Sequence, residues 1–527
     1  MTANRVPLSP LSFLDRAAAV YPSGVGVVTG AGETLGYADL HRHATTLADR
    51  LNASGLGTGD RVAILAPNDV PLLAAHYGVP TAGAALVALN TRLAAEEYHY
   101  ILNHADVALL IVDDELADRL GPDLRTAVPG LERVLRIGGD DSYADWLAQG
   151  HPDGRLRLPS TEDAPITVNY TSGTTGRPKG VVYTHRGAYL AALGVALQMH
   201  LTPESVYLWT LPMFHCNGWC FTWAVTAAGG SHVCQRKFDA DGAIELIERH
   251  GVSHFCGAPV VLNSIVNAPR AATVTFAARV TTAVGGAPPS PTVIARAAAM
   301  NLDVVHLYGL TETYGPSLVC EPQPSWAGLD RGELAVRTAR QGVRTVHVDG
   351  VRVVDGSMVD VPADATTIGE IVVRSNTVMA GYLHDEQATR EAFRGGWFHT
   401  GDLAVRHPDG YVEIRDRAKD IIISGGENIS SIEVENVLVA HPAVLEAAVV
   451  ATAHDHWGEV PVAFVAVHPD AQVDAAELIS WVRDRLAHFK APREVHFGEL
   501  PKTSTGKIRK SELRDRVRST AKEQACP

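Results

Sequence analysis

The sequence predicts an α/β protein with a large N-terminal domain of several subdomains and a small C-terminal α+β domain. A chain of 527 residues exceeds what one hydrophobic core usually organises, so at least two domains are expected. Short apolar runs alternate with helical patterns through most of the chain, and this rhythm changes after about residue 366. The composition, 46% apolar and 20% charged, is that of an ordinary globular protein.

The N-terminal part predicts parallel βαβ units. Runs rich in Val, Ile and Leu are typical of buried parallel strands, and the segments between them are long enough for helices. Strands are expected over 61–67, 85–90, 107–114, 253–259 and 302–309, and helices over 69–84 and 96–106.

The segment after residue 366 predicts short strands joined by turns, with Asp409-Gly410 as one turn dipeptide. Helix and strand then alternate in a compact tail, in which residues 475–492 predict an amphipathic helix closed by Pro492. We therefore place a boundary near Ala418–Asp420, between domains of residues 1–418 and 419–527.

The charge of the chain limits its ligands. A formal net charge of -14 lacks the basic field that a nucleic-acid-binding protein needs. A polyanionic ligand must be held by local features against this charge, which favours a small phosphorylated molecule in a dedicated pocket.

The cysteines and the apolar stretches bear on the compartment. Six scattered cysteines without a ligand pattern predict reduced thiols rather than disulfides or a zinc site. No secretory signal and no stretch near the ~20 apolar residues of a membrane span are found. The prediction is a cytoplasmic protein without an integral membrane segment, and a homodimer is left open.

Residues 169–180, NYTSGTTGRPKG, form a loop whose composition needs an explanation. It is a poor helix and a poor strand, because Ser and Thr compete for backbone hydrogen bonds and Gly loses entropy on ordering. A strand precedes it and a strand and a helix follow, so backbone N–H groups, hydroxyls and Lys179 can meet one ligand. These donors suit a triphosphate, although Gly180 after Lys179 departs from the P-loop pattern.

The run YTSGTTGRPKG resembles the phosphate-binding signature of the ANL superfamily of acyl-CoA synthetases, peptide-synthetase adenylation domains and firefly luciferases. The segments 285–288, 306–313, 399–403 and 501–510 resemble further motifs of this family in the same order. The resemblance implies the ANL fold and binding of ATP or AMP by Thr171, Ser172, Gly173, Thr174, Thr175, Gly176, Lys179, Gly286, Ala287, Pro288, His306, Tyr308, Gly309, Thr311, Glu312, Asp402, Arg417 and Lys507.

The resemblance also implies roles within this set. Glu312 and Thr174 are implied to hold Mg²⁺, and Asp402 with Arg417 to bind the ribose hydroxyls. Lys507 is implied to contact the acyl carboxylate and the bridging phosphate oxygens, where a cation offsets the repulsion of two anions in the transition state.

The implied reaction has two steps, acyl-adenylate formation from ATP and a carboxylic acid, and transfer of the acyl group to a thiol with release of AMP. The small domain is implied to be mobile and to rotate about a hinge at Lys419 between them. Rotation withdraws Lys507 and presents the coenzyme A residues Gly425, Gly426 and Glu427, where glycines leave room for the pantetheine arm.

The segment LPMFHCNGWCFTWAV (211–225) resembles synthetases for medium-chain fatty or aryl acids. It implies an acyl pocket of His215, Asn217, Trp219, Trp223 and Gly285, although Trp223 fits the protein core equally well. The leading prediction is an acid–CoA ligase that uses ATP, Mg²⁺ and coenzyme A, with the acid left open. The alternatives are a relative that only forms thioesters from a supplied acyl-AMP, and a non-catalytic nucleotide-binding protein.

Overall fold

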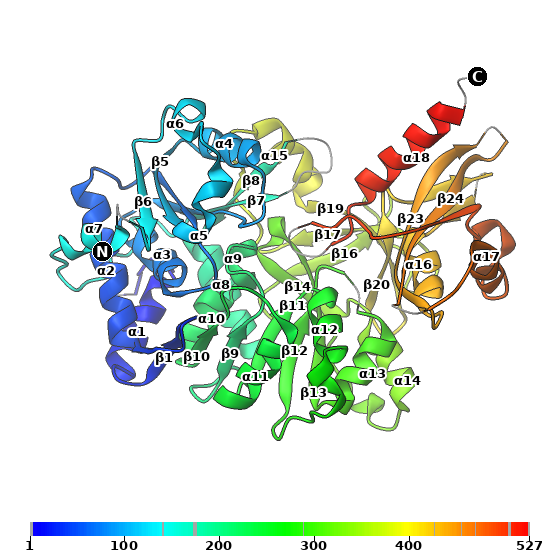
Figure 1. The fold of residues 1–527 in the computed structure, drawn as a ribbon, viewed down its shortest axis with the longest axis horizontal. Coiled ribbons are helices and arrows are strands. Elements are labelled where there is room, and N and C mark those ends of the chain that lie inside the picture. Colours follow the sequence, from blue (N-terminus) through cyan, green and yellow to red (C-terminus); the bar gives the residue numbers. More distant parts are fainter. Residues whose placement is uncertain are drawn as a thin grey trace.

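The computed structural model describes residues 4–139, 142–171, 177–287, 289–425, 427–454, 456–468, 471–503 and 507–524. Three sheets belong to the large N-terminal part and a fourth to the C-terminal part. Figure 1 shows the C-terminal elements, coloured orange to red, gathered at one end of the molecule beside the blue-to-green body. This arrangement confirms the predicted α/β class with a large and a small domain.

The seven-stranded sheet carries the loop of residues 169–180, which is rich in glycine and hydroxyl side chains and is called the glycine-hydroxyl loop below. Its strands in spatial order are β18 (Gly381–Tyr382), β8 (Lys179–Thr184), β7 (Pro165–Thr171), β4 (Ala85–Ala88), β3 (Arg61–Leu65), β5 (Val107–Asp113) and β6 (Arg133–Ile137). The pairs from β7 to β6 are parallel, whereas β7 pairs with β8, and β8 with β18, in antiparallel fashion. The predicted strands over 61–67, 85–90 and 107–114 are therefore neighbours in one parallel core.

The nine-stranded sheet packs beside the first. Its strands in spatial order are β15 (Val343–Arg344), β14 (Gly315–Val319), β13 (Leu302–Leu310), β12 (Val280–Val284), β11 (His254–Gly257), β9 (Val206–Trp209), β10 (Ser231–Cys234), β1 (Val25–Val28) and β2 (Thr34–Gly36). The predicted strands over 253–259 and 302–309 lie here as β11 and β13.

The segment after residue 366 contains short strands joined by turns, as predicted. Three of them, β17 (Gly369–Arg374), β19 (Phe398–Arg406) and β20 (Val412–Arg417), form an antiparallel sheet with the earlier strand β16 (Gly350–Val354), in the order β16, β17, β19, β20. The β19–β20 turn contains Gly410, whose φ of 87° is a conformation that glycine adopts without steric cost.

The C-terminal sheet contains β22 (Glu427–Ile429), β21 (Ile422–Ser424), β24 (Gly458–Val467) and β23 (Val444–His454), with β25 (Glu494–Phe497) beside β24. Helices α16 (Ser431–Val439), α17 (Ala475–Arg483) and α18 (Lys510–Gln524) pack on it. No helix of the described residues is long and apolar enough to cross a membrane.

The remaining helices belong to the N-terminal part. They are α1 (Leu11–Val20), α2 (Tyr37–Ala53), α3 (Val70–Thr81), α4 (Ala95–His104), α5 (Asp114–Ala117), α6 (Leu124–Ala127), α7 (Tyr143–Ala148), α8 (His185–Gln198), α9 (Cys216–Trp219), α10 (Phe221–Ala228), α11 (Ala240–His250), α12 (Pro259–Val266), α13 (Pro291–Ala299), α14 (Arg331–Thr338) and α15 (Glu386–Ala392). Short 3₁₀ turns are η1 (Asp118–Leu120), η2 (Pro269–Ala272), η3 (Thr311–Thr313), η4 (Pro324–Trp326), η5 (Arg394–Gly396) and η6 (His488–Lys490).

The predicted helix over 475–492 is too long. Helix α17 ends at Arg483, where the carbonyl oxygen of Val482 accepts hydrogen bonds from the N–H groups of Arg485 and Leu486. The chain then turns so that residues 494–497 can pair with β24. A continuous helix to Pro492 would carry this segment away from the sheet, so tertiary pairing overrides the helical pattern.

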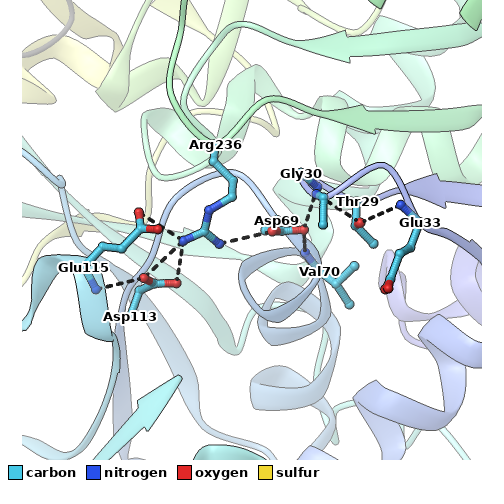
Figure 2. Close-up of polar contacts among 9 residues, drawn as sticks. Thr29, Gly30, Glu33, Asp69, Val70, Asp113, Glu115 and Arg236 are labelled. Carbon is cyan, nitrogen blue, oxygen red and sulfur yellow. Dashed lines mark hydrogen bonds and ion pairs between the residues drawn. The ribbon is translucent and has the colours of Figure 1, made fainter. Parts of the chain in front are cut away.

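An ion-pair cluster joins the two large sheets (Figure 2). Arg236, which follows β10, lies 3.1 Å from Asp69, 3.1 Å from Asp113 and 3.2 Å from Glu115. Asp69 also caps α3 by accepting from the N–H of Val70, so one arginine ties the start of that helix to the end of β5. Because the Asp113 side chain is only 6% exposed, it depends on this cation for its charge balance.

Candidate active site

The two ends of the glycine-hydroxyl loop lie side by side. Thr171 at the end of β7 pairs with Lys179 at the start of β8, so the loop closes between antiparallel strands. The loop residues predicted to bind phosphate, Ser172, Gly173, Thr174, Thr175 and Gly176, lie outside the described residues.

The strand β13 leads directly into the turn that carries the predicted magnesium ligand. Tyr308 and Gly309 lie near the end of β13, and Thr311 and Glu312 lie on η3. Gly309 is required there, because a Cβ atom would lie 2.0 Å from the carbonyl oxygen of Gly315. His306 is buried on β13, and its Nδ1 is 2.8 Å from the carbonyl oxygen of Arg340.

Gly286 and Ala287, which follow β12, are exposed, as a ligand-contacting segment requires. Gly286 has a φ of 85°, a left-handed conformation that suits glycine. The third predicted member of this segment, Pro288, lies outside the described residues.

The predicted ribose residues form one polar group. Asp402 on β19 is opposite Arg417 on β20, and their side chains are 3.1 Å apart from Oδ1 to Nε. The hydroxyl of Tyr308 donates to Oδ2 of Asp402 over 2.7 Å. The carboxylate is 5% exposed and is held by a cation and a phenol, which leaves further lone pairs of its oxygens for other donors.

Lys507 of the C-terminal domain belongs to the same group. Its N–H donates to Oγ1 of Thr503 over 3.0 Å, and the next residue, Ile508, forms an isolated antiparallel bridge with Lys502. The residue retains exposed surface, yet the surrounding protein removes enough water to lower its pKa to about 8. Arg417 lowers this pKa further, whereas Asp402 raises it.

His215 lies near enough to this lysine to feel its charge. Burial lowers the pKa of His215 to about 4, and the charge of Lys507 contributes in the same direction. The imidazole is therefore neutral at pH 7 and can exchange hydrogen bonds with an acid without adding charge. The structure thus brings His215, Asp402, Arg417 and Lys507 together from segments almost 300 residues apart.

The segment after His215 is a left-handed turn. Cys216, Asn217, Gly218, Trp219 and Cys220 have φ angles of 45°, 43°, 59°, 51° and 69°. Each non-glycine residue in this conformation costs roughly 1–2 kcal/mol, so the surrounding structure must hold the turn. Gly218 is needed because a Cβ atom would lie 2.6 Å from the Trp209 ring.

The side chain of Asn217 holds this turn in the protein interior. Its Oδ1 accepts from Oγ1 of Thr167 over 2.6 Å and from Nδ2 of Asn169 over 2.5 Å. Its Nδ2 donates to Nε2 of His76, 3.0 Å away. Burial lowers the pKa of His76 to about 4, which keeps Nε2 unprotonated and able to accept. Asn217 is fully buried, so it fixes the turn rather than facing an open pocket.

The turn directs Trp219 toward Gly285. A Cβ atom on Gly285 would lie 2.9 Å from the Trp219 ring, so the indole rests directly on the glycine backbone. Trp219 retains 8% of its surface, whereas Trp223 has none. The indole N–H of Trp223 donates to the hydroxyl of Tyr314 over 2.7 Å, and its ring meets His76 and Tyr77 edge to face. Of the two tryptophans, Trp223 packs in the core.

The predicted hinge and coenzyme A residues lie on the C-terminal side of Arg417. Lys419 is exposed in the turn between β20 and β21. Gly425, with a φ of 60°, donates to the carbonyl oxygen of Trp457 over 2.7 Å, and Glu427 is exposed at the start of β22. Gly426 lies outside the described residues.

The metal-binding capacity of the site is small. Among the described residues, no three His, Cys, Asp or Glu side chains form a group that could hold a metal ion. Glu312 supplies a single carboxylate, which fits Mg²⁺ bound mainly through substrate phosphates and water.

The sequence analysis did not single out Tyr382, whose hydroxyl donates to Oε1 of Glu312 over 3.0 Å. The two residues are 70 positions apart, and no periodic pattern or motif spacing links them. Their contact arises because β18 pairs with β8, which is a tertiary event.

Comparisons with known proteins agree with this site. Residues 14–383 match the family model described as AMP-binding enzyme, and residues 433–507 match the AMP-binding enzyme C-terminal domain. The chain is 44% identical to an acetate–CoA ligase of Humulus lupulus, over 98% of this chain and 96% of that protein. It is 41% identical to a peroxisomal trans-cinnamate:CoA ligase of Petunia hybrida, over 98% and 95%.

A solved structure agrees with the fold as well. The anthranilate CoA ligase AuaEII in complex with anthranoyl-AMP is 25% identical and has a TM-score of 0.88. The alignment covers 99% of this chain and all of that one.

Proposed function

Since the chain belongs to the AMP-binding enzyme family and is an AMP-forming acyl-CoA ligase, we propose that it activates a short-chain carboxylic acid with ATP and passes the acyl group to coenzyme A. The observation that carries the residue roles is the convergence of Lys507 with Asp402, Arg417 and His215. This convergence supports full ligase chemistry over thioester formation alone.

In the first half-reaction, the acid carboxylate attacks the α-phosphorus of ATP and pyrophosphate leaves. Lys507 balances the negative charge that gathers between carboxylate and phosphate, where a positioned cation is most effective. Asp402 and Arg417 orient the ribose, and the neutral His215 orients the acid. The loop 171–179 holds the leaving phosphates through N–H groups, hydroxyls and Lys179.

Mg²⁺ fits this site as a partner of the phosphates. Glu312 is the described carboxylate that we assign to it, with Thr174 as a further ligand. The ion supplies charge neutralisation on the phosphates when it is bound.

In the second half-reaction, the thiol of coenzyme A attacks the carbonyl carbon of the acyl-adenylate and AMP leaves. Lys507 has no role at this stage. Rotation about Lys419, at the boundary between residues 1–418 and 419–527, would replace it with Gly425, Gly426 and Glu427. Exposure of Lys419 and of Gly425 supports this exchange.

The short-chain preference rests on Trp219. Its ring lies on Gly285, one of the proposed acyl-pocket residues, and the acetate–CoA ligase relative acts on a small acid. The trans-cinnamate and anthranilate ligases show that relatives can also take larger acids. The size of the side chain at this position is therefore the expected determinant.

Replacement of Trp219 by Ala should shift the acid preference from two to four carbons toward longer chains or aryl acids. The ratio of kcat/KM between a long and a short acid should rise about 10- to 100-fold, as for pocket changes of a few methylene groups. The measurement is AMP release with a panel of acids, ATP and coenzyme A. Trp219→Phe should give an intermediate shift.

Trp223→Phe is the matched control for this panel. It removes a hydrogen bond to Tyr314 in the core and should lower the melting temperature without changing the ratio. If the unaltered enzyme already prefers long acids, or if Trp223→Phe shifts the ratio as much as Trp219→Ala, the proposed pocket is wrong.

The adenylation half-reaction should lose activity as the pH rises through about 8. Lys507 must be protonated to offset the developing charge, and burial together with Arg417 places its pKa near that value. The kcat/KM of ATP–pyrophosphate exchange reports groups of the free enzyme and should show this falling limb. Thioester formation from synthetic acyl-AMP should lack this falling limb. In Lys507→Arg the falling limb should also disappear, and pyrophosphate exchange should be slower at every pH.

We also propose the cytoplasm as the compartment. The five cysteines of the described residues are free and buried, which suits a reducing environment. The name of the trans-cinnamate relative assigns that protein to peroxisomes, whose matrix is the alternative.

A further inference from the structure

The segment 379–383 connects the glycine-hydroxyl loop to the turn of Glu312. On one side, Ala380 and Leu383 donate from their N–H groups to the carbonyl oxygens of Val182 and Gly180 over 2.9 and 2.7 Å. On the other side, the N–H of Met379 donates to the carbonyl oxygen of Glu312 over 2.8 Å. The segment 379–383 is thus bonded both to β8, which begins at Lys179, and to the turn that carries Glu312.

The side chain of Tyr382 on this strand contacts both charged residues of that site. Its hydroxyl donates to Oε1 of Glu312 over 3.0 Å. Nζ of Lys179 lies over its ring, 4.6 Å from the centroid, which is within the range of a cation–π interaction. Burial and the neighbouring carboxylate raise the pKa of Tyr382, so its hydroxyl keeps the proton that it donates.

The backbone of Tyr382 is itself fixed. Its N–H donates to Oγ1 of Thr389 over 2.9 Å, and that hydroxyl donates to the carbonyl oxygen of Asp385 over 2.8 Å. Gly381 allows this approach, because a Cβ atom there would lie 2.9 Å from the methyl group of Thr389. Helix α15 therefore fixes the backbone of Tyr382.

Glu312 and Lys179 form no ion pair with each other or with any other described residue. A carboxylate and an ammonium group near one another normally pair, and a nucleotide would then have to break that pair. Here each group has a neutral partner, a phenol for the carboxylate and a ring face for the ammonium. Neutral partners bind more weakly than an opposite charge, so both charges remain available.

We propose that Tyr382 is a positioning residue that keeps Glu312 and Lys179 apart and oriented before ATP and Mg²⁺ bind. The inference rests on the proposed function, in which Glu312 serves the ion and Lys179 the phosphates. It adds to that function the residue that prevents the two groups from neutralising each other.

Tyr382→Phe tests the hydroxyl, and Tyr382→Leu tests the ring. Binding of ATP is measured by calorimetry as a function of Mg²⁺ concentration and again in EDTA. Loss of a hydrogen bond to a charged group should raise the Mg²⁺ concentration for half-maximal binding about tenfold in Tyr382→Phe. In EDTA, Tyr382→Leu should bind ATP several-fold more weakly than Tyr382→Phe, because only the leucine variant loses the partner of Lys179.

A double-mutant comparison separates positioning from a general structural role. In a Glu312→Gln background, Tyr382→Phe should have no further effect on Mg²⁺ dependence. The ratio of pyrophosphate exchange to thioester formation from acyl-AMP should fall about tenfold in Tyr382→Phe. Tyr143→Phe, which removes a hydroxyl bonded to His43 away from the site, is the matched control and should change neither quantity.

An unchanged Mg²⁺ dependence in Tyr382→Phe would overturn the inference, as would an equal effect in the Glu312→Gln background or an equal loss of both half-reactions. The proposed function fails separately, if the unaltered enzyme gives no acid-dependent pyrophosphate exchange. The binding measurements on ATP and Mg²⁺ need no acid and still decide the role of Tyr382 in that case.

Discussion

Lys507→Ala should reduce acid-dependent ATP–pyrophosphate exchange by about 10²- to 10³-fold, the range observed when one positioned electrostatic donor is removed from a transition state. The physical reason is the meeting of two anions, the acid carboxylate and the α-phosphate. Lys507 is the cation that the C-terminal domain contributes beside Asp402 and Arg417. The surrounding protein lowers its pKa to about 8, so the ammonium is a positioned cation in the place where the charge develops.

The same variant should form thioester from synthetic acyl-AMP at a rate within a few-fold of the unaltered enzyme, because the adenylate is then already made. Lys502→Ala is the matched control. Lys502 is bridged to Ile508, the neighbour of Lys507, but its side chain pairs with Glu446 at 2.7 Å, so its loss should affect stability and leave the ratio of the half-reactions intact. An equal decline of both half-reactions in Lys507→Ala would assign the lysine a structural role instead.

The sequence was sufficient for the parts of the fold that depend on local pattern. Strands β3, β4 and β5 and helices α3 and α4 occur where apolar runs and helical periodicity predicted them, because a parallel sheet covered by helices leaves a strong signal in each segment. The helix over 475–492 was predicted too long, since pairing of β25 with β24 is a long-range contact. Local periodicity contains no information about such a contact.

In the site, too, residues in sequence motifs could be predicted, whereas features that depend on long-range contacts could not. Asp402 and Arg417 were named from ordered motifs, and the register of β19 with β20 places them opposite each other. The left-handed turn at 216–220 could not be predicted, because four of its five residues are not glycine. It exists through hydrogen bonds to Asn217 from residues about 50 positions away. Tyr382 was missed for a similar reason.

Lys419→Pro should uncouple the two half-reactions. Proline fixes φ near −65° and also restricts the residue before it, so residues 418 and 419 lose the freedom that a domain rotation requires. Lys419 already has a negative φ, since it is not among the residues with positive values. The substitution should therefore favour the present orientation. Pyrophosphate exchange should persist, whereas thioester formation from acyl-AMP should fall about 10²-fold or more.

Hydrogen bonds across the proposed hinge hold the present orientation. Asp416, before the hinge, accepts from the N–H and hydroxyl of Ser431, and the ammonium group of Lys510 donates to that hydroxyl over 2.6 Å. The proposed rotation about Lys419 would have to break the bonds to Asp416. Lys419→Ala keeps that freedom and is the control. If Lys419→Pro turns over acid, ATP and coenzyme A at the unaltered rate, residue 419 is not the hinge, and the exchange of Lys507 for the coenzyme A residues must occur by another movement.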